Sequence, residues 1–197
     1  MIRNLSLSLL LAVTAAFTSS VSFAATYTVD QSHSHVGFKV RHLISKTAGE
    51  FRDFEGEFTY DPKKPLESKV HFVAKSESIN TNNAKRDDHL KGADFFDVQK
   101  FQTLTFDSKK VKANGKDKYK VEGDLTIHGV TKPAEFDVEY TGAAKDPWGN
   151  NRVGFNATSK INRKDFGVVW NKTLDTGGMM IGDDVDVTLE IEGIEKK

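Results

Sequence analysis

The 197-residue chain contains no cysteine, which excludes disulfides, thiolate catalysis and cysteine-ligated metal sites. It has no net charge, with 28 basic and 28 acidic side chains, so it lacks the excess of basic residues with which proteins bind nucleic acids. It also lacks G-x-S-x-G, H-E-x-x-H, a phosphate-binding glycine loop and G-x-G-x-x-G. We therefore expect no enzyme, no cofactor and no nucleic-acid partner, and stability must come from burial and backbone pairing.

The most hydrophobic stretch stands at the N-terminus. Arg3, an apolar run over residues 5–13 and a small-residue stretch ending at Ala24 follow the order of a secretory signal. Polar residues interrupt the run after residue 13, so it falls short of the roughly 20 apolar residues of a membrane span. We expect residues 1–24 to be a signal peptide that is removed and residues 25–197 to form one domain.

Apolar and polar residues alternate through most of the mature chain, which is the pattern of half-buried strands. Turn signals such as Asn114-Gly115 separate the alternating segments. The pattern predicts eight strands, at 36–40, 54–60, 70–74, 104–106, 119–127, 134–140, 153–161 and 185–191. Such an all-β chain folds as an antiparallel sandwich or a closed barrel, and we favour the barrel because closure removes exposed sheet edges.

The rows expected to face inward combine large rings with small residues. Small eight-stranded barrels either fill their interior with side chains or hold one small ligand there. Alternation alone leaves both readings open. The inward residues that would line a ligand cavity are Phe38, Val40, Phe72, Leu104, Phe106, Leu125, Phe136 and Phe155.

The stretch NNAKRDDHLKGADFFD, residues 82–97, departs from the alternation and predicts one short helix. Asn82 or Asn83 can cap it, and Gly92 can end it. A helix of about two turns is marginal alone, so it must dock on the barrel, where Leu90 and the pair Phe95-Phe96 supply apolar contacts. We expect this helix to act as a lid whose charged face lies near an opening.

Polar residues of the lid and of a later loop could form the mouth of such a cavity. Guanidinium donors suit a phosphate, carboxylate or carbonyl head group, although ordinary solvated charge is the competing interpretation. Trp170 and the pair Met179-Met180 could line or gate the opening, or plug the end of the barrel. His42 shares the apolar row and could contact a polar ligand group or be a satisfied core histidine. The predicted mouth residues are His42, Arg86, His89, Phe95, Phe96, Arg163, Asp165, Trp170 and Met179.

His33 and His35 have a spacing that can ligate zinc or copper. On strand parity both point outward, and no acidic partner is evident from the sequence. We expect a hydrogen-bonding or surface role and no metal site.

Five short motifs follow one another along the mature chain: DQSHSHVGFKVRH (30–42), GEFRDFEG (49–56), RDDHLKGADFF (86–96), GDLTIHGVTKP (123–133) and NRKDFG (162–167). With the signal peptide, they resemble the YceI-like family of exported, lipocalin-like barrels that bind polyisoprenoids or similar amphiphilic chains. One departure is His35, which adds a second histidine to the motif's usual His-Ser.

The resemblance implies an eight-stranded antiparallel lipocalin-like barrel with a lid, an elongated apolar tunnel and no catalysis. It further implies a bacterial periplasmic location and a possible homodimer. The expected partner is a long-chain isoprenoid or other amphiphilic lipid, of the isoprenoid quinone or polyisoprenoid phosphate type, with transient membrane contact possible. The alternative is an envelope stress or interaction module with a packed barrel and no lipid cargo.

Overall fold

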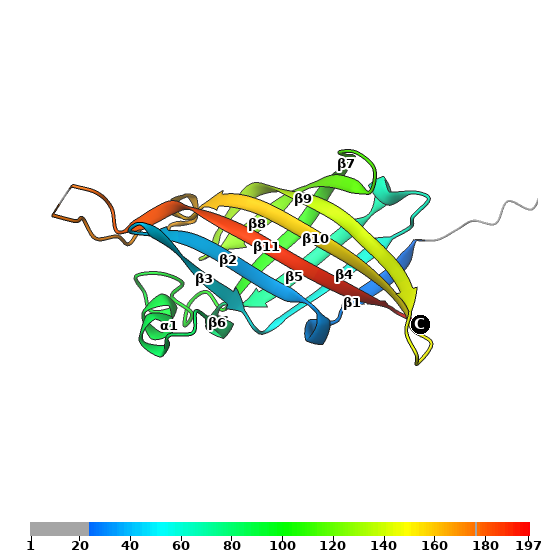
Figure 1. The fold of residues 1–197 in the computed structure, drawn as a ribbon, viewed down its shortest axis with the longest axis horizontal. Coiled ribbons are helices and arrows are strands. Elements are labelled where there is room, and N and C mark those ends of the chain that lie inside the picture. The colour runs from blue at the N-terminus through cyan, green and yellow to red at the C-terminus, as the bar shows by residue number, and fades with distance from the viewer. Residues whose placement is uncertain (1–23, 176) are drawn as a thin grey trace, which may run out of the picture.

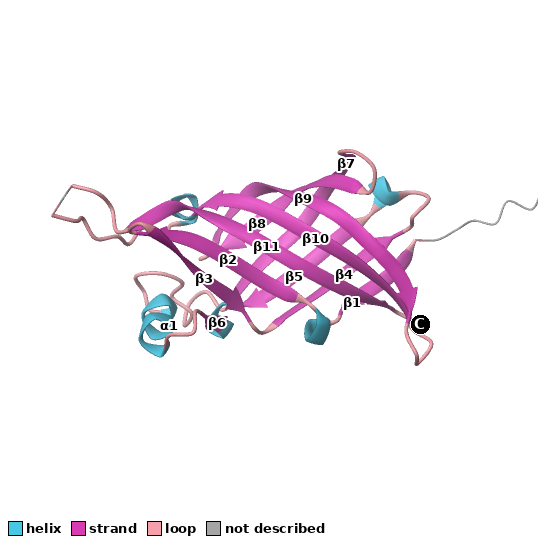
Figure 2. Ribbon diagram, in the orientation of Figure 1, coloured by secondary structure: helices cyan, strands magenta, loops and turns pink. Residues whose placement is uncertain are grey.

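The structure is a computed structural model and describes residues 24–175 and 177–197 (Figure 1). The predicted signal peptide therefore lies outside the described residues, apart from Ala24. Strands dominate, as Figure 2 shows, and no described helix is long and apolar enough to cross a membrane. The described strands are β1 (Ala25–Val29), β2 (His35–His42), β3 (Ser45–Phe51), β4 (Phe54–Tyr60), β5 (Lys69–Lys75), β6 (Ile79–Asn80), β7 (Thr103–Ala113), β8 (Lys118–Ile127), β9 (Val130–Lys145), β10 (Asn151–Asn162) and β11 (Ile181–Glu195).

The strands form one antiparallel sheet that closes on itself. Strand β11 pairs with β1 through Gly193 and Val29, and with β2 through Val185 and Val40. Strands β1 and β2 are thus one barrel strand, interrupted by the 3-10 helix η1 (Gln31–His33). The next two barrel strands are divided in the same way. Strand β4 pairs with β1 and β3 with β2, so β3 and β4 share one position. Strand β5 pairs with β4 and β6 with β3, so β5 and β6 share the next. The described strands therefore occupy eight positions, which confirms the predicted eight-stranded antiparallel barrel.

The breaks explain why the sequence pattern missed β1, β3 and β6. Asp30 ends β1 by capping η1, with its Oδ1 accepting from the Ser32 amide at 3.0 Å. Strand β3 carries little apolar alternation, since Thr47 and Gly49 stand where large residues would mark an inward row. The ring of Phe38 fills the space at Gly49, where an added Cβ would lie 2.3 Å from its Cζ.

Helix α1 (Ala84–Lys91) follows β6 and begins and ends as predicted. The Asn83 side chain caps it by accepting from the Arg86 amide, and the Gly92 amide donates to the His89 carbonyl. In Figure 1 the helix lies beside the barrel at the end of β3 and β6. Strand β6 pairs with β3 and not with β7, so α1 and the segment after it stand where the described sheet is interrupted.

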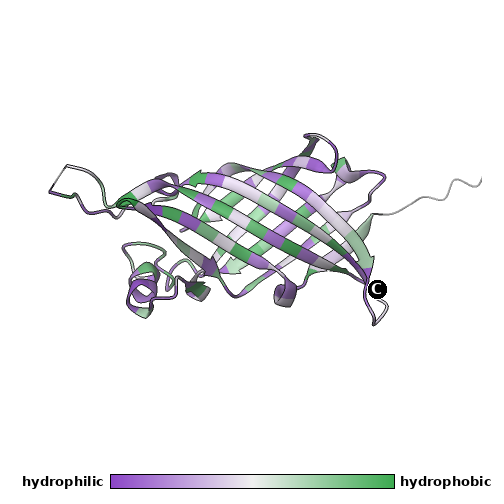
Figure 3. Ribbon diagram, viewed as in Figure 1, coloured by the Kyte–Doolittle hydropathy of each residue, from purple (hydrophilic) through white to green (hydrophobic). Residues whose placement is uncertain are grey.

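The remaining short helices are η2 (Pro65–Glu67), η3 (Ser76–Ser78) and η4 (Arg163–Phe166). Hydrophobic and hydrophilic residues alternate along the strands in Figure 3, as expected for a wall with one dry face. We call the end that carries α1, the 43–44 turn and residues 167–175 and 177–180 the lid end. The opposite end, the far end, carries the turns at 61–68, 114–117 and 146–150 (Figure 1).

Candidate functional site

An apolar cavity of about 450 Å³ lies inside the barrel. This volume falls in the range of roughly 300–1,000 Å³ that is typical of small-molecule sites. The cavity runs from Arg86, His89 and Trp170 at the lid end to Thr59, Tyr60 and Ser68 at the far end. Rings and aliphatic side chains of the strands line its length, among them Phe38, Val40, Phe51, Phe58, Phe72, Leu104, Phe106, Leu125, Phe136, Phe155, Val187 and Leu189.

The strand alternation places these side chains inward, and the rings pack on one another where they meet. Phe54 stacks on Phe72 with 5.7 Å between the ring centroids, and Phe106 meets Phe136 edge-on at 4.9 Å. An added Cβ at Gly123 would lie 2.6 Å from the Phe106 ring, so the glycine lets this ring lie against β8. The rings thus lie against the wall, with the space of the cavity between them.

The far end of the cavity is built from tyrosines. Tyr60 stacks on Tyr140 at 5.4 Å and meets Phe155 edge-on at 5.1 Å. Burial raises the pKa of the Tyr60 phenol, and the neighbouring phenols of Tyr119 and Tyr140 raise it further. Tyr60 therefore stays a neutral phenol even further above physiological pH than an ordinary tyrosine does.

Three rings meet at the lid end. His89 of α1 lies edge-on to Phe95 at 5.0 Å and to Trp170 at 4.9 Å, and Phe95 and Trp170 are 5.2 Å apart. The His89 Nε2 also contacts an Asp94 oxygen at 3.0 Å. This cluster joins the lid to the segment after η4, and all three of its rings line the cavity.

The lid is held by a buried polar contact that the sequence did not reveal. The Asp87 carboxylate accepts from both the amide and the hydroxyl of Thr81, at 2.8 and 2.5 Å. Arg86 donates to the same residue, from Nε to Oγ1 at 2.7 Å and from Nη2 to the carbonyl at 2.8 Å. Thr81 and Asp87 are buried while Arg86 is exposed, so the lid turns one carboxylate inward and leaves a guanidinium at the mouth.

Arg163, predicted at the mouth, is buried and binds backbone. Its Nε donates to the Gly182 carbonyl at 2.9 Å, and its Nη1 to the carbonyls of Val168 and Trp170 at 2.7 and 2.9 Å. Burial lowers the pKa of this guanidinium, which Asp183 partly opposes. Arg163 thus ties the segment that carries Trp170 to the start of β11.

Of the seventeen predicted ligand-binding residues, the structure places fifteen in the cavity wall. Asp165 and Met179 are not part of that wall in the described residues. Asp165 is exposed in η4. Met179 is exposed and forms an isolated bridge with Thr173, and the next residue, Met180, lines the cavity instead. The wall also includes Met180, which was expected at the opening, and Val168 and Ile181, which carried no alternation signal because they lie before β11 and at its first residue.

The predicted placement of His33 and His35 on one strand is wrong, whereas both side chains are exposed and contact a carboxylate, as expected for a surface role. His33 lies in η1 rather than on a strand, and its Nδ1 contacts Asp30 at 2.8 Å, whereas the Nδ1 of His35 lies 3.4 Å from Glu50. Each imidazole therefore has an acidic partner, Asp30 for His33 and Glu50 for His35, which the strand pattern did not reveal.

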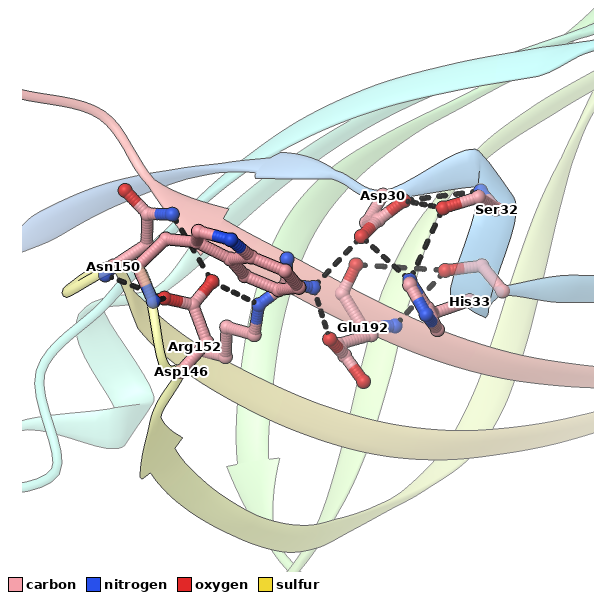
Figure 4. Close-up of polar contacts among 9 residues, drawn as sticks. Asp30, Ser32, His33, Asp146, Asn150, Arg152 and Glu192 are labelled. Atoms are coloured by element: carbon pink, nitrogen blue, oxygen red, sulfur yellow. Dashed lines mark hydrogen bonds and ion pairs between the residues drawn. The ribbon is translucent and has the colours of Figure 1, made fainter.

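Asp30 and His33 belong to a polar cluster beside η1, which Figure 4 shows. Ligand atoms of Asp30, His33 and Glu192 lie within 4.8 Å of one another, a spacing that a metal ion could bridge. Arg152 already occupies this space, because its Nη1 donates to Asp30 at 2.7 Å and also to Glu192, and its Nε donates to Asp146 at 2.8 Å. The cluster is therefore a guanidinium clamp between β1, β10 and β11, and a cation would have to displace Arg152.

The clamp shifts the titration of its carboxyls. Burial opposes ionisation of Asp30, but hydrogen bonds from Ser32, Arg152 and His33 outweigh it and hold the pKa well below the ordinary value. Asp146 behaves in the same way, with hydrogen bonds from Arg152 and Asn150 outweighing burial. Both carboxyls are ionised at neutral pH.

A closed eight-stranded barrel around an elongated apolar cavity defines the class of lipocalin-like binding barrels. Residues 27–193 match the YceI-like domain, and the chain belongs to the YceI-like family. It is 42% identical over 184 residues to a UPF0312 protein of Yersinia pestis, covering 92% of both chains. The crystal structure of a Campylobacter jejuni YceI protein superposes with a TM-score of 0.68 at 31% identity, covering 96% of this chain and 100% of that one.

A more distant structure shares the fold. It is described as a polyisoprenoid binding domain from Saccharophagus degradans, and it superposes with a TM-score of 0.60 at 14% identity. The superposition covers 88% of this chain and 100% of that one. This likeness concerns the barrel itself.

Proposed function

We propose that the protein is an exported, periplasmic binding protein that holds a long-chain amphiphilic lipid in its barrel, for carriage or sequestration. The cavity carries this proposal, because it is apolar along its length and has charged and polar groups at the lid end. The likeness to a polyisoprenoid binding domain supports a cargo of the isoprenoid quinone or polyisoprenoid phosphate type. The export signal expected at residues 1–24 supports the location.

The size of the hydrophobic effect determines which residues select the cargo. Burying a methylene contributes roughly 0.8 kcal/mol, so a five-carbon isoprene unit leaving water contributes up to ~4 kcal/mol before ordering costs. A tail that leaves a bilayer exchanges one apolar environment for another, and most of this gain cancels. Selection against bulk lipid then depends on the head-group contacts and on the shape of the cavity.

The residues at the mouth suit a head group with acceptor oxygens. The Arg86 Nη1 makes no hydrogen bond within the described residues, while Nε and Nη2 fix the guanidinium on Thr81. In the proposed complex Arg86 binds the head group, and the rings of His89, Phe95 and Trp170 close over the first part of the tail.

Extraction from vesicles tests the proposal. Lipid-stripped protein is incubated with phosphatidylcholine vesicles that contain a trace of labelled polyisoprenoid phosphate or isoprenoid quinone, then separated, and the label bound to protein is counted. We expect the wild type to take up label and Phe106→Asp to take up none, because an unpaired carboxylate in the apolar wall opposes both tail and fold. Since this variant could fail to fold, Ala157→Leu is the second test, as it narrows the cavity without adding charge.

Arg86→Gln separates the contributions of head group and tail. It should reduce uptake of the phosphate by about tenfold and leave quinone uptake nearly unchanged, because a charge-assisted hydrogen bond is lost only with the anion. Folded wild-type protein that takes up neither label would overturn the proposed function.

A further inference from the structure

Two segments at the lid end expose apolar side chains beyond the barrel. Ile44, in the turn between β2 and β3, is fully exposed at 104%, and Leu43 beside it is 41% exposed. Val169 and Met179, on the segment between η4 and β11, are 61% and 46% exposed. In Figure 1 this segment and the β2–β3 turn project from the same end of the barrel as α1.

Hydrogen bonds join the two segments into one edge. The Leu43 amide donates to the Met180 carbonyl at 2.9 Å, and the Arg41 Nη1 donates to the carbonyls of Leu43 and Met179 at 3.2 and 3.3 Å. The second segment is itself paired, with the Met180 amide donating to the Lys172 carbonyl at 3.0 Å. We call Leu43, Ile44, Val169 and Met179 the mouth rim.

The mouth rim is continuous with the opening of the cavity. The residues adjacent to its members in the chain, His42, Trp170 and Met180, line the cavity wall. Each segment therefore turns one side chain into the cavity and the next one out to solvent. Exposed apolar groups gathered around an apolar opening mark an interaction site rather than the scattered exposure that is normal on protein surfaces.

The charges near the rim are largely taken up within the protein. Lys46 pairs with Asp186 at 2.5 Å, and Lys164 pairs with Asp183 at 2.9 Å. The Arg41 guanidinium is turned onto backbone carbonyls of the rim itself. Arg86 and Lys172 are exposed and make no ion pair within the described residues, but exposed Asp88 and Asp165 balance them at the same end. No net cationic charge is left to attract an anionic surface, so the apolar tips are the features available for contact.

We propose that the mouth rim inserts into the surface of a lipid bilayer and sets the cavity opening against the membrane. This inference rests on the proposed function, because a bilayer is where a long-chain isoprenoid lipid resides. Projecting tips suit insertion between head groups, whereas a protein partner would need a broader face with satisfied polar groups. The cargo then passes between bilayer and barrel without crossing water.

The chain carries its own reporters, since its two tryptophans lie at opposite ends of the barrel. Trp170 stands at the mouth beside Val169, and Trp148 lies 78% exposed in the far-end turn between β9 and β10. The probe is a phosphatidylcholine vesicle without isoprenoid lipid, carrying brominated acyl chains. In Trp148→Phe the fluorescence of Trp170 should be quenched on adding vesicles, whereas in Trp170→Phe that of Trp148 should stay unquenched.

Substitutions in the rim test the same contact by sedimentation with vesicles. Ile44→Ser should lower partitioning by about tenfold, and Ile44→Ser with Met179→Ser further, because each removes an apolar group from the bilayer. Leu66→Ser, at the far end, is the matched control and should change nothing, since Leu66 is exposed to 50% but lies away from the mouth. Partitioning should also change little between low and high salt.

Wild-type partitioning that is absent, unaffected by the rim substitutions, or dependent on anionic lipid and low salt would overturn the inference. Label uptake, measured in parallel with vesicles that contain the labelled isoprenoid lipid, keeps the two proposals apart. Uptake without vesicle contact through the rim refutes the docking surface and leaves the proposed function standing. Contact through the rim without uptake refutes the proposed function.

Discussion

The imidazole of His89 and the indole of Trp170 meet edge-on, with 4.9 Å between their ring centroids. His89 belongs to α1, whereas Trp170 follows η4 and is held by Arg163 through its carbonyl. The contact therefore joins two segments that are separated in the sequence by strands β7 to β10. It places an aromatic closure over the end of the cavity.

Removing that closure should speed the exchange of cargo. Trp170→Ala deletes the edge-on contact with His89 and the tilted ring contact with Phe95, each of which contributes about 0.5–1.5 kcal/mol beyond area burial. We expect the rate at which a bound fluorescent lipid probe moves from the cavity to vesicles, measured by stopped-flow fluorescence, to rise roughly tenfold. Trp148→Ala is the control, and equal rates in the two variants would count against a gating role.

Enlarging a side chain distinguishes a hollow barrel from a packed one. Ala157 and Val153 lie on the same face of β10, but Ala157 lines the cavity and Val153 does not. In lipid-stripped protein Ala157→Leu should change the free energy of unfolding by less than about 1 kcal/mol, because the cavity accommodates the added carbons. Val153→Phe should cost about 1–3 kcal/mol by overpacking. Urea unfolding measures both, and an equal cost at the two sites would indicate a filled interior.

The two adjacent acidic residues of α1 should respond very differently to truncation. Asp87→Ala removes the acceptor of the Thr81 amide and hydroxyl and should cost about 1–3 kcal/mol, since it leaves a buried donor unpaired. Asp88→Ala, one residue on, removes an exposed carboxylate and should stay within about 0.5 kcal/mol. Thermal unfolding gives the comparison, and hydrogen exchange of the α1 amides should rise in the first variant alone.

The Arg152 clamp makes stability fall at acid pH. The pKa values of Asp30 and Asp146 are lower in the folded protein than in the unfolded chain, so their stabilisation is complete above the unfolded value of about 3.9 and is lost as pH falls toward the folded values. The melting temperature should therefore drop steadily from about pH 4 downward.

Arg152→Met should reduce that slope, because the carboxyls then lose one of the partners that lower their pKa, while the hydrogen bonds from Ser32 and Asn150 remain. It should also lower the melting temperature at pH 7 by several degrees, since three carboxylates remain close together without a counter-charge. Lys145→Met, a surface substitution near the same turn, provides the control. An unchanged acid slope in Arg152→Met would show that other groups dominate the pH dependence.

The barrel was predictable because its long strands carry a strict period of two. Residues 119–127 and 185–191 alternate without interruption, and they lie within β8 and β11 as expected. The cap at Asn83 and the end at Gly92 were likewise predicted, since both are local features of the sequence. Broken strands such as β3 escaped prediction because their inward positions hold small residues that are covered by rings from elsewhere.

The polar side chains of the site were less predictable, because no periodic pattern marks which groups the fold brings next to them. Nothing in the pattern distinguishes buried Asp87 from exposed Asp88, and only tertiary contact with Thr81 does so. The role of Arg163 was equally hidden, since the carbonyls to which it donates surround the guanidinium only in the folded protein. Arg152 carried no motif at all, although it holds three carboxylates.

Native mass spectrometry of the protein, freshly purified from its own cells without detergent or solvent, tests the central claim most directly. We expect a reproducible adduct whose mass, after organic extraction, corresponds to an amphiphile with a long isoprenoid tail, and we expect it to be lost in Ala157→Leu but retained in Leu66→Ser. Folded wild-type protein that is reproducibly free of any adduct would contradict the account.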